Sequence, residues 1–306
     1  MKIMITGGTG SLAQFLIREL EGEHDLVLLD RVKPGEGLYA KYVTRHPYVQ
    51  GDLTVGDDVA RAVAGCDAVM HLGAIIFPTD SGSYPTAPLP PDQKRMPPEE
   101  CMRVNTMGTY HVMREAVRAG VKVVVTITSN CVLGHIMRIS DRPFQISYLP
   151  VDEEHPQDPE DSYGLSKSFQ EQIMDAWSRA YGIRAYALRP SWLVRPEIQQ
   201  AHAANPEPTD AWTDEVLNGY SDIGEVAKAL RLCLEAHNDL PRYDAYYINA
   251  PDIWAPEETL ELLRKLRPDL LDKVRGDLSS RKAFISNEKA RKAFGYQPEN
   301  SWTRFQ

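Results

Sequence analysis

The chain has 306 residues, of which 42% are hydrophobic and 25% are charged. This composition is typical of a folded enzyme and excludes a disordered or fibrous protein, and the length predicts one large or two closely packed domains. The 34 basic and 43 acidic residues give a net charge of −9, which argues against a nucleic-acid partner because a basic surface is needed to neutralise a phosphate backbone.

Short apolar runs alternate with amphipathic stretches through the first 190 residues. Apolar runs of this length predict buried parallel strands, and the stretches between them have the periodicity of helices. The order of strand, helix and strand predicts an α/β fold with a Rossmann-like doubly wound parallel sheet. The predicted strands are 3–6, 25–30, 48–50, 68–72, 121–127 and 184–188, and the predicted helices are 12–20, 56–64, 99–119 and 162–181.

The alternation breaks down at two places. Seven prolines between Ile76 and Pro98 predict a long surface loop, which is either a lid over a binding site or a plain excursion. After residue 188 the pattern loosens through 195–213, a segment that contains Pro, Ala and Asn. The elements predicted beyond it are a helix at 222–236, a strand at 245–249 and short helices at 256–265 and 286–294.

The glycine-rich sequence from Thr6 to Ala13 follows the first predicted strand and opens the first predicted helix. Glycines here let the backbone approach a pyrophosphate, which the free N–H groups and the positive dipole end of the helix stabilise. The alternative interpretation is a simple glycine-rich turn. In a dinucleotide site, the residues that contact the cofactor are Gly7, Thr9, Gly10, Ser11 and Leu12.

A carboxylate at the end of the second strand supports dinucleotide binding. Asp30 stands about 20 residues beyond the loop, where it can accept hydrogen bonds from both adenosine ribose hydroxyls and would repel a 2′-phosphate. This favours NAD over NADP, although the adjacent Arg31 is able to pair with a phosphate. The other interpretation of Asp30 is a helix or turn cap. Asp52 and Leu53 are candidates for contact with the adenine, and Asp52 is also a candidate helix N-cap.

Tyr163 and Lys167 are one turn apart in the predicted helix 162–181, so their side chains share one face. A lysine ammonium beside a phenol favours the phenolate, which lowers the tyrosine pKa and lets Tyr163 take a proton from an alcohol. Such a pair on an isolated helix is typical of a solvated surface. Its position downstream of a dinucleotide loop favours catalysis, with Tyr163 as general acid or base and Lys167 also at the nicotinamide ribose.

The predicted strand 121–127 runs out into small hydroxyl residues at its carboxyl end, where ligands bind in sheets of this type. We expect Ser129 to be the third catalytic residue, with its hydroxyl bonded to the substrate oxygen. Thr128 competes for this role. A turn cap is the structural alternative for Ser129.

These motifs together resemble the extended short-chain dehydrogenase/reductase family, the NAD-dependent epimerase/dehydratase group, over nearly the whole chain. The resemblance implies an NAD-binding Rossmann domain over 1–190, with 222–250 returning to it. It implies a small C-terminal substrate-binding part made of 191–221 and 251–306. Further segments that carry the resemblance are Gly51–Leu53, His71–Ala74, Asn105–Thr109, Arg189–Pro190 and Ser221–Ile223. Further residues implied to contact NAD are Leu72, Gly73, Ala74, Asn105, Ile127, Pro190 and Ser191.

Within this family, the run 128–134 is most similar to the uronate dehydrogenase branch, whose members oxidise free sugar acids. Those enzymes have a histidine where Cys131 stands, and arginines after the sixth strand, where this chain has Arg195. Sugar-nucleotide dehydratases have an acidic pair in place of Asn130 and Cys131, so elimination of water is not expected. The candidate substrate contacts are Ser129, Asn130, Cys131, Tyr163, Ser191, Trp192 and Arg195, with structural turn roles as the alternative for Asn130 and Ser191.

The remaining basic residues carry less specific signals. If the substrate is an anion, Arg195, Arg138 and Arg142 are the candidate cations that bind it. His71, His111 and His135 are interpreted as satisfied or exposed imidazoles rather than catalytic bases.

We expect an NAD-dependent dehydrogenase acting on a secondary or hemiacetal hydroxyl of a small polar substrate similar to a sugar or sugar acid. The alternatives are an epimerase that retains NAD and a non-catalytic dinucleotide sensor on the same fold. The predicted helices 99–119 and 162–181 correspond to the pair that forms a four-helix dimer interface in many relatives, which implies a homodimer.

The four cysteines are far apart in the sequence and show no zinc-like spacing, so we expect reduced thiols and no metal. The chain enters a strand-like run at once, which leaves no room for a signal peptide. No stretch reaches the roughly 18 apolar residues that a membrane helix needs. These features predict a cytoplasmic protein with no membrane partner.

Overall fold

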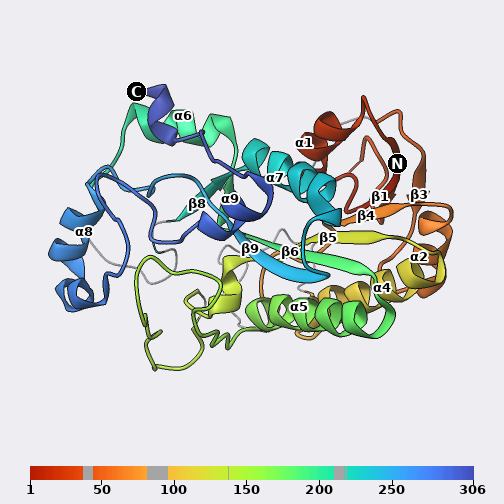
Figure 1. Cartoon of the computed structure of the whole chain (residues 1–306), viewed down its shortest axis with the longest axis horizontal. Helices are drawn as coiled ribbons and strands as arrows, with labels where there is room; N and C mark the ends of the chain where they lie inside the picture. The colour runs from red at the N-terminus through yellow and green to blue at the C-terminus, as the bar shows by residue number, and fades with distance from the viewer. Residues whose placement is uncertain (37–43, 81–95, 137, 210–216, 218) are drawn as a thin grey trace.

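The computed structural model describes residues 1–36, 44–80, 96–136, 138–209, 217 and 219–306. A seven-stranded sheet lies at its centre, with every pair of neighbouring strands parallel (Figure 1). The predicted doubly wound parallel fold is therefore confirmed. In spatial order, the strands are β3 (Tyr48–Gln50), β2 (Asp25–Asp30), β1 (Lys2–Thr6), β4 (Ala68–His71), β5 (Val123–Ile127), β6 (Arg184–Pro190) and β9 (Tyr243–Ile248).

Helices cover both faces of the sheet (Figure 1). Successive side chains of β1 point to opposite faces, so Ile3 and Ile5 enter one hydrophobic core and Met4 enters the other. Burial on both faces explains why the strands are nearly continuous apolar runs. One face carries α1 (Ser11–Leu20), α7 (Ile223–Glu235) and α9 (Glu288–Phe294), and the other carries α2 (Gly56–Val63), α4 (Gly108–Arg118) and α5 (Ser162–Tyr181).

The predicted helix 99–119 forms as one helical run with an irregular turn. It begins with α3 (Glu100–Met102) and ends with α4. The segment between them, η2 (Arg103–Met107), is one turn of π-helix, called the π-turn below. Such a turn inserts an extra residue into a helix and is common at functional sites. Asn105 lies in it.

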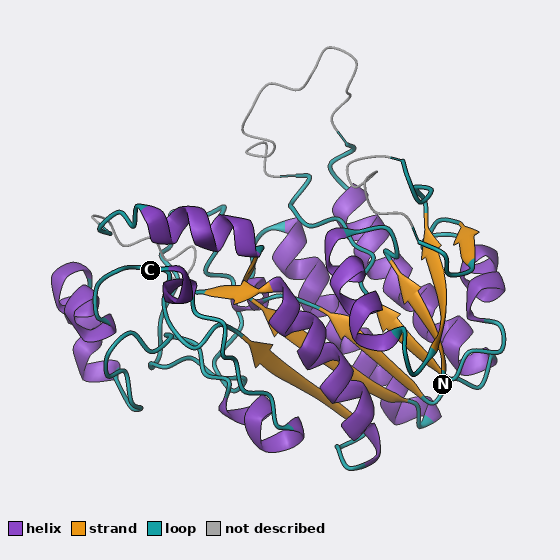
Figure 2. Cartoon of the chain, turned by 90° about the horizontal axis from the view of Figure 1, so that it is seen from above, coloured by secondary structure: helices purple, strands orange, loops and turns teal. Residues whose placement is uncertain are grey.

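A smaller C-terminal part lies beside the sheet, as the view from above in Figure 2 also shows. It contains the parallel strand pair β7 (Trp192–Val194) and β8 (Tyr220–Asp222), and α6 (Pro196–Ala204) begins just after β7. These three elements are not predicted, because the pattern of the sequence loosens after residue 188. The remaining elements are α8 (Thr259–Leu266), η3 (Asn130–Leu133), η4 (Ala236–Asn238), η5 (Pro268–Lys273) and η6 (Trp302–Phe305).

The predicted loop 76–98 falls partly outside the described residues. Its two ends, 76–80 and 96–98, contain neither helix nor strand. Residues 81–95 lie outside the described part of the chain, so the role of the loop stays a prediction. Among the helices described, none is both long enough and apolar enough to cross a membrane.

Candidate active site

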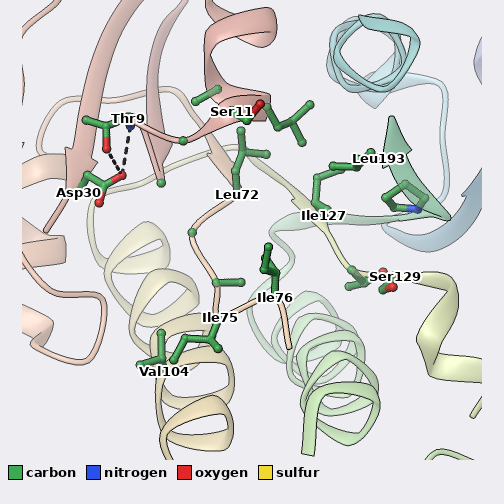
Figure 3. A pocket seen from close by; sticks show the side chains of 18 of the residues that line it. Thr9, Ser11, Asp30, Leu72, Ile75, Ile76, Val104, Ile127, Ser129 and Leu193 are labelled. Carbon is green, nitrogen blue, oxygen red and sulfur yellow. Dashed lines mark hydrogen bonds between the residues drawn. The ribbon is translucent and has the colours of Figure 1, made fainter. Parts of the chain in front are cut away.

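A cavity of about 830 Å³ lies at the carboxyl ends of the strands, where the strand order reverses between β1 and β4 (Figure 3). This is the position at which open α/β sheets bind ligands, and the volume is typical of small-molecule sites. All predicted site residues line the cavity except Asn105. They are Gly7, Thr9, Gly10, Ser11, Leu12, Asp30, Arg31, Asp52, Leu53, Leu72, Gly73, Ala74, Ile127, Ser129, Asn130, Cys131, Tyr163, Lys167, Pro190, Ser191, Trp192 and Arg195.

A set of apolar residues that line the same cavity is absent from the predicted site. Two of them, Ile75 and Ile76, directly follow the segment His71–Ala74, so the family resemblance could have been extended to them. The others come from η2, β7, α6 and the segment after η3, and no motif marks them. The missed apolar residues include Ile75, Ile76, Val104, Ile136, Leu193 and Ile198.

The backbone of the loop after β1 forms a hollow, here called the glycine cradle, which side chains in place of its glycines would fill. Gly7 has a φ of +64°, and a Cβ atom on it would lie 2.8 Å from the Cα atom of Gly73, in the loop after β4. The N–H of Gly10 donates to the carbonyl of Gly7 at 2.9 Å. Gly10 is also the N-cap residue of α1, and having no side chain it leaves the N-terminal N–H groups of this helix to an incoming anion. The cradle therefore fits a pyrophosphate.

The carboxylate of Asp30 is held by the loop that it faces (Figure 3). Its Oδ2 atom accepts hydrogen bonds from the backbone N–H (3.1 Å) and hydroxyl (2.8 Å) of Thr9, and its Oδ1 atom accepts from the N–H of Val32 (3.2 Å). Asp30 therefore has the turn-capping role that was its structural alternative, and it lines the cavity as well. Because a carboxylate offers about four lone pairs and three are engaged here, it can still accept one hydrogen bond from a ligand hydroxyl.

Asp52 does not cap a helix, since the N-cap residue of α2 is Val55. Its Oδ1 atom accepts hydrogen bonds from the N–H and the hydroxyl of Thr54, both at 2.8 Å. Burial acts to raise the pKa of Asp52, but these hydrogen bonds and the guanidinium of Arg31, 3.8 Å away, hold it below its usual value. A charged Asp52 and the neighbouring Leu53 therefore form the cavity wall near the end of β3.

Helix α5 presents the predicted tyrosine and lysine to the cavity. Asp161 caps the helix by accepting hydrogen bonds from the N–H groups of Tyr163 and Gly164, both at 2.9 Å. The Nζ atom of Lys167 lies 5.6 Å from the centroid of the Tyr163 ring and donates to the carbonyl of Ile127 at 3.1 Å. The cap and this bond fix both side chains at the end of β5.

The protein groups alone do not lower the pKa of Tyr163, contrary to our expectation. Burial raises it well above its usual value, and a hydrogen bond with Ser129 offsets only part of this rise. Burial also lowers the pKa of Lys167 to about 8, because it takes the ammonium out of water. Burial thus disfavours the charged forms of both Tyr163 and Lys167. A protonated Lys167 acts in the opposite direction on Tyr163, because a nearby positive charge favours the phenolate.

The hydroxyls of Thr128 and Ser129 face different neighbours. Thr128 donates to Oε1 of Glu171 at 2.9 Å, and the two oxygens of Glu171 also pair with the buried Arg189. The Oγ atom of Ser129 accepts a hydrogen bond from the N–H of Cys131 at 3.1 Å, which caps η3. Of these two hydroxyls, Ser129 is the one that forms a hydrogen bond with Tyr163. Ser129 also has the turn-capping role that was its structural alternative.

Asn130 and Ser191 belong to one buried network in the cavity wall. The Nδ2 atom of Asn130 donates to the hydroxyl of Ser191 at 3.1 Å, and that hydroxyl donates to Oδ1 of Asn249. The N–H of Ser191 donates to the hydroxyl of Ser221 at 3.0 Å. Asn130 and Ser191 therefore have structural hydrogen-bonding roles, and both residues also line the cavity.

Cys131 and Trp192 complete this end of the cavity. Burial raises the pKa of the Cys131 thiol to about 12, so the wall here is a neutral thiol. Trp192 is 48% exposed and packs edge to face on Trp254, with ring centroids 5.3 Å apart. A half-exposed indole at a cavity mouth is available to pack against a ligand.

Two of the three candidate arginines are paired elsewhere. Arg138 and Arg142 both form ion pairs with Asp158 and Glu160, and neither lines the cavity. The third, Arg195, lines the cavity at the phosphate loop.

Arg195 contacts helix α1 at two points. Its Nη1 atom donates to the hydroxyl of Ser11 at 2.6 Å, and its guanidinium carbon lies 5.6 Å from the ring centroid of Phe15. The structure therefore places Arg195 beside the first turn of α1.

Asn105 lies behind the cavity wall and not in it. Its side-chain amide is fully buried and bonds to both backbone groups of Ile75, accepting from the N–H at 2.8 Å and donating to the carbonyl at 2.9 Å. It also donates to the hydroxyl of Ser166 on α5 at 2.9 Å. We therefore regard Asn105 as a residue that positions the loop after β4, rather than a direct cofactor contact.

His71 is a satisfied core histidine, as we expect from the sequence. The hydroxyl of Thr6 accepts hydrogen bonds from the N–H groups of Leu72 (3.1 Å) and Gly73 (3.0 Å), so its proton is donated to Nδ1 of His71, 2.7 Å away. The Nε2 atom then carries the ring proton and donates to the hydroxyl of Thr109 at 3.0 Å. Burial lowers the pKa of His71 to about 3, so the imidazole is neutral.

Comparison with known proteins identifies relatives of this chain. The model of the NAD dependent epimerase/dehydratase family matches residues 3–248. A uronate dehydrogenase of Pseudomonas syringae pv. tomato is 29% identical over 189 residues, which cover 61% of this chain and 58% of the relative. A putative UDP-glucose 4-epimerase of Methanocaldococcus jannaschii is 26% identical over 192 residues, which cover 62% of this chain and 55% of the relative. The chain thus matches less than two thirds of the length of these relatives.

Solved structures share the fold. A mutated uronate dehydrogenase superposes with a TM-score of 0.62 at 18% identity, covering 99% of this chain and 83% of the other. Structural similarity at 18% sequence identity is evidence for a shared fold alone. The family match over residues 3–248 agrees with the glycine cradle, Asp30 and the tyrosine–lysine pair found at the cavity. The chain belongs to the NAD-dependent epimerase/dehydratase family.

Proposed function

We propose that this protein is an NAD-dependent oxidoreductase that transfers hydride between NAD and a secondary or hemiacetal hydroxyl of a small polar substrate, a sugar or sugar acid. The observation that carries the proposal is that Ser129, Tyr163 and Lys167 line the same cavity as the glycine cradle. The uronate dehydrogenase among the relatives supports the substrate class.

The residues of the cavity fit NAD along its length. The cradle at Gly7 and Gly10 receives the pyrophosphate, and the remaining lone pair of Asp30 accepts a hydrogen bond from the adenosine ribose. When bound, NAD supplies the group that accepts the hydride. The other residues that we assign to NAD are Thr9, Ser11, Leu12, Arg31, Asp52, Leu53, Leu72, Gly73, Ala74, Ile127, Tyr163, Lys167, Pro190 and Ser191.

The catalytic step uses the three residues at the ends of β5 and α5. The Ser129 hydroxyl bonds to the substrate oxygen and orients it toward the phenol of Tyr163. Tyr163 takes the proton of the substrate hydroxyl as hydride leaves the adjacent carbon, and returns it in the reverse reaction. Lys167 stabilises the phenolate through its ammonium, which the Ile127 carbonyl holds in place. Asn130, Cys131, Ser191 and Trp192 shape the substrate end of the cavity.

A second candidate function is sugar or nucleotide-sugar epimerisation, favoured by the putative UDP-glucose 4-epimerase among the relatives. An epimerase uses the same tyrosine but keeps its NAD and returns the hydride to the opposite face of the substrate. The two functions differ in cofactor release. Tightly retained NAD in the purified protein supports epimerisation.

The experiment records the NAD content of the purified protein and then follows nicotinamide reduction with free sugars, sugar acids, polyols and nucleotide sugars. We expect turnover of one free-sugar class, and a loss of activity of about 10²- to 10⁴-fold in Tyr163→Phe, which should still bind NAD. Tyr181→Phe is the matched control, because Tyr181 is at the exposed end of the same helix.

Four outcomes would argue against the proposed function or a part of it. Silence across the panel with NAD co-purified favours the epimerase. Silence without bound NAD contradicts both enzymatic functions. Full activity of Tyr163→Phe contradicts the role given to the tyrosine. Silence from a protein that carries no co-purified NAD but binds added NAD favours the dinucleotide sensor.

A further inference from the structure

The proposed function gives Arg195 no role, although its guanidinium lines the cavity. We propose that Arg195 binds the pyrophosphate of NAD and is not the ligand of a substrate carboxylate. The C-terminal part of the chain then contributes directly to cofactor binding. This inference rests on the proposed function, since it takes NAD as the cofactor.

The side chain of Arg195 lies against the phosphate loop. Ser11, whose hydroxyl accepts the 2.6 Å hydrogen bond from Nη1 of Arg195, is the first residue of α1 and follows the N-cap Gly10. Phe15, one turn further along α1, lies under the guanidinium at 5.6 Å. These two contacts hold the positive charge beside the N–H groups that receive a pyrophosphate.

The backbone of Arg195 is fixed from both sides. The residue before it, Val194, is buried and pairs with Asp222 in the β7–β8 sheet. Arg195 is itself the N-cap residue of α6, which begins at Pro196. Gln199 of the same helix donates to Oδ2 of Asp222 at 2.7 Å. The guanidinium therefore reaches the phosphate loop from a rigid base, and little entropy is lost when a ligand binds it.

An anion bound at this point would be attracted both by the guanidinium and by the positive end of the α1 dipole. A cation beside a helix N-terminus is repelled by the positive end of the helix dipole. A pyrophosphate between the guanidinium and the helix N–H groups turns this repulsion into attraction. The planar guanidinium is suited to bind phosphate oxygens in pairs.

The position of Arg195 does not suit a substrate ligand. The reacting hydroxyl is placed by Ser129 and Tyr163, which come from the ends of β5 and α5. Arg195 instead contacts α1, and Figure 3 shows Ser11 and Ser129 at separate places on the cavity wall. The analogy with uronate dehydrogenases, whose arginines after the sixth strand grip a carboxylate, therefore does not transfer to this arginine.

The test measures the dissociation constants of NAD and ADP-ribose by calorimetry for the wild-type protein and Arg195→Leu. ADP-ribose carries the pyrophosphate without the nicotinamide. We expect both ligands to bind about 10- to 100-fold more weakly to the variant, the loss typical of one or two charge-assisted hydrogen bonds. Arg195→Lys keeps the positive charge but not the planar guanidinium, so its affinity for both ligands should fall less than that of Arg195→Leu. The salt dependence of binding should also weaken in Arg195→Leu.

Arg18→Leu is the matched control, because the Arg18 guanidinium lies over the same Phe15 ring, at 5.5 Å, but does not line the cavity. We expect its NAD affinity to stay within about twofold of the wild type. The unfolding temperature of ligand-free Arg195→Leu should equal that of the wild type, while its rise on addition of NAD should be smaller.

Two results would overturn the assignment while leaving the proposed function intact. One is wild-type affinity of Arg195→Leu for NAD and ADP-ribose. The other is a raised KM for an acidic substrate at saturating NAD with no change in the NAD dissociation constant. If the wild-type protein itself binds neither ligand, the proposed function fails first and the assignment fails with it.

Discussion

Tyr163 and Lys167 show how burial can oppose the chemistry that a motif indicates. Burial raises the pKa of the phenol and lowers the pKa of the ammonium to about 8. Two groups this close titrate as a pair, so the phenolate gains stability only while the lysine keeps its proton. The Ile127 carbonyl, which accepts a hydrogen bond from Lys167, supports the charged lysine.

This pair predicts a pH profile. Oxidation needs Tyr163 as the phenolate, whose fraction grows with pH, so kcat/KM for oxidation should rise as pH rises. Lys167→Met removes a cation that typically lowers the pKa of a nearby acid by about 1–3 units, so the rising limb should move to higher pH by about one unit or more. The measurement is kcat/KM against pH at saturating NAD.

Lys167→Arg is the control for that profile, because it keeps a positive charge at the position. Its rising limb should stay near that of the wild type even if kcat falls. A limb that does not move in Lys167→Met would show that the ammonium does not act on Tyr163.

At the scale of elements, the π-turn η2 decides where one wall of the cavity lies. It carries Asn105, whose amide holds the backbone of Ile75 and contacts Ser166 of α5. The loop after β4 is thereby tied to the helix that carries Tyr163. Asn105 thus acts on the cavity through the loop after β4, without lining the cavity itself.

Asn105→Ala should therefore destabilise the fold and weaken NAD binding. It leaves the N–H and the carbonyl of Ile75 buried without these partners, and each unpaired group costs about 1–3 kcal/mol, so the free energy of unfolding should fall by about 2–6 kcal/mol. Chemical unfolding measures this loss. Thr106→Ala is the control, since the buried hydroxyl of Thr106 has no hydrogen-bond partner among the described residues, and it should cost little. Equal stability of both variants would contradict the role of Asn105.

The sequence predicts elements well where burial is complete. Strands β1, β2, β4, β5 and β6 are mostly buried apolar runs because helices cover both faces of the sheet, so their pattern is strong. The edge strand β3 is only partly buried. The strands β7 and β8 and the helix α6 are short and owe their form to packing around Tyr220 and Trp302, which no local pattern reveals. The π-turn escapes prediction because its residues have ordinary helical periodicity.

Site residues are predictable where chemistry dictates a type and a spacing, as with Asp30, Tyr163 and Lys167. Their contacts across the fold are not. Arg195 contacts Ser11 from 184 positions away, and only the tertiary fold brings the end of β7 to the first turn of α1. The pKa of Tyr163 depends on burial, which spacing does not report.

At the scale of the whole molecule, the outer side of α4 and α5 stays a predicted dimer interface. These helices lie side by side on one face of the sheet (Figure 1). Each exposes an aromatic side chain, Tyr110 and Phe169 respectively. Four helices from two chains would cover these side chains.

Light scattering after gel filtration tests this interface. We expect twice the chain mass of 34.4 kDa for the wild-type protein and a monomer for Phe169→Glu, because a dimer would bury the added charge. Ile139→Glu, at an exposed position outside both helices, is the control and should remain a dimer. A wild-type mass near 34.4 kDa would contradict the prediction.

The hydrogen bonds between Thr9 and Asp30 bear on any attempt to alter the cofactor. Accepting a 2′-phosphate requires removal of the carboxylate that repels it. In this chain the same carboxylate holds the N–H and the hydroxyl of Thr9 within the phosphate loop. Replacing Asp30 alone would slacken the loop and reduce the affinity for both dinucleotides. Dinucleotide preference and loop rigidity are encoded in one side chain, so redesign of the first requires a compensating change at Thr9.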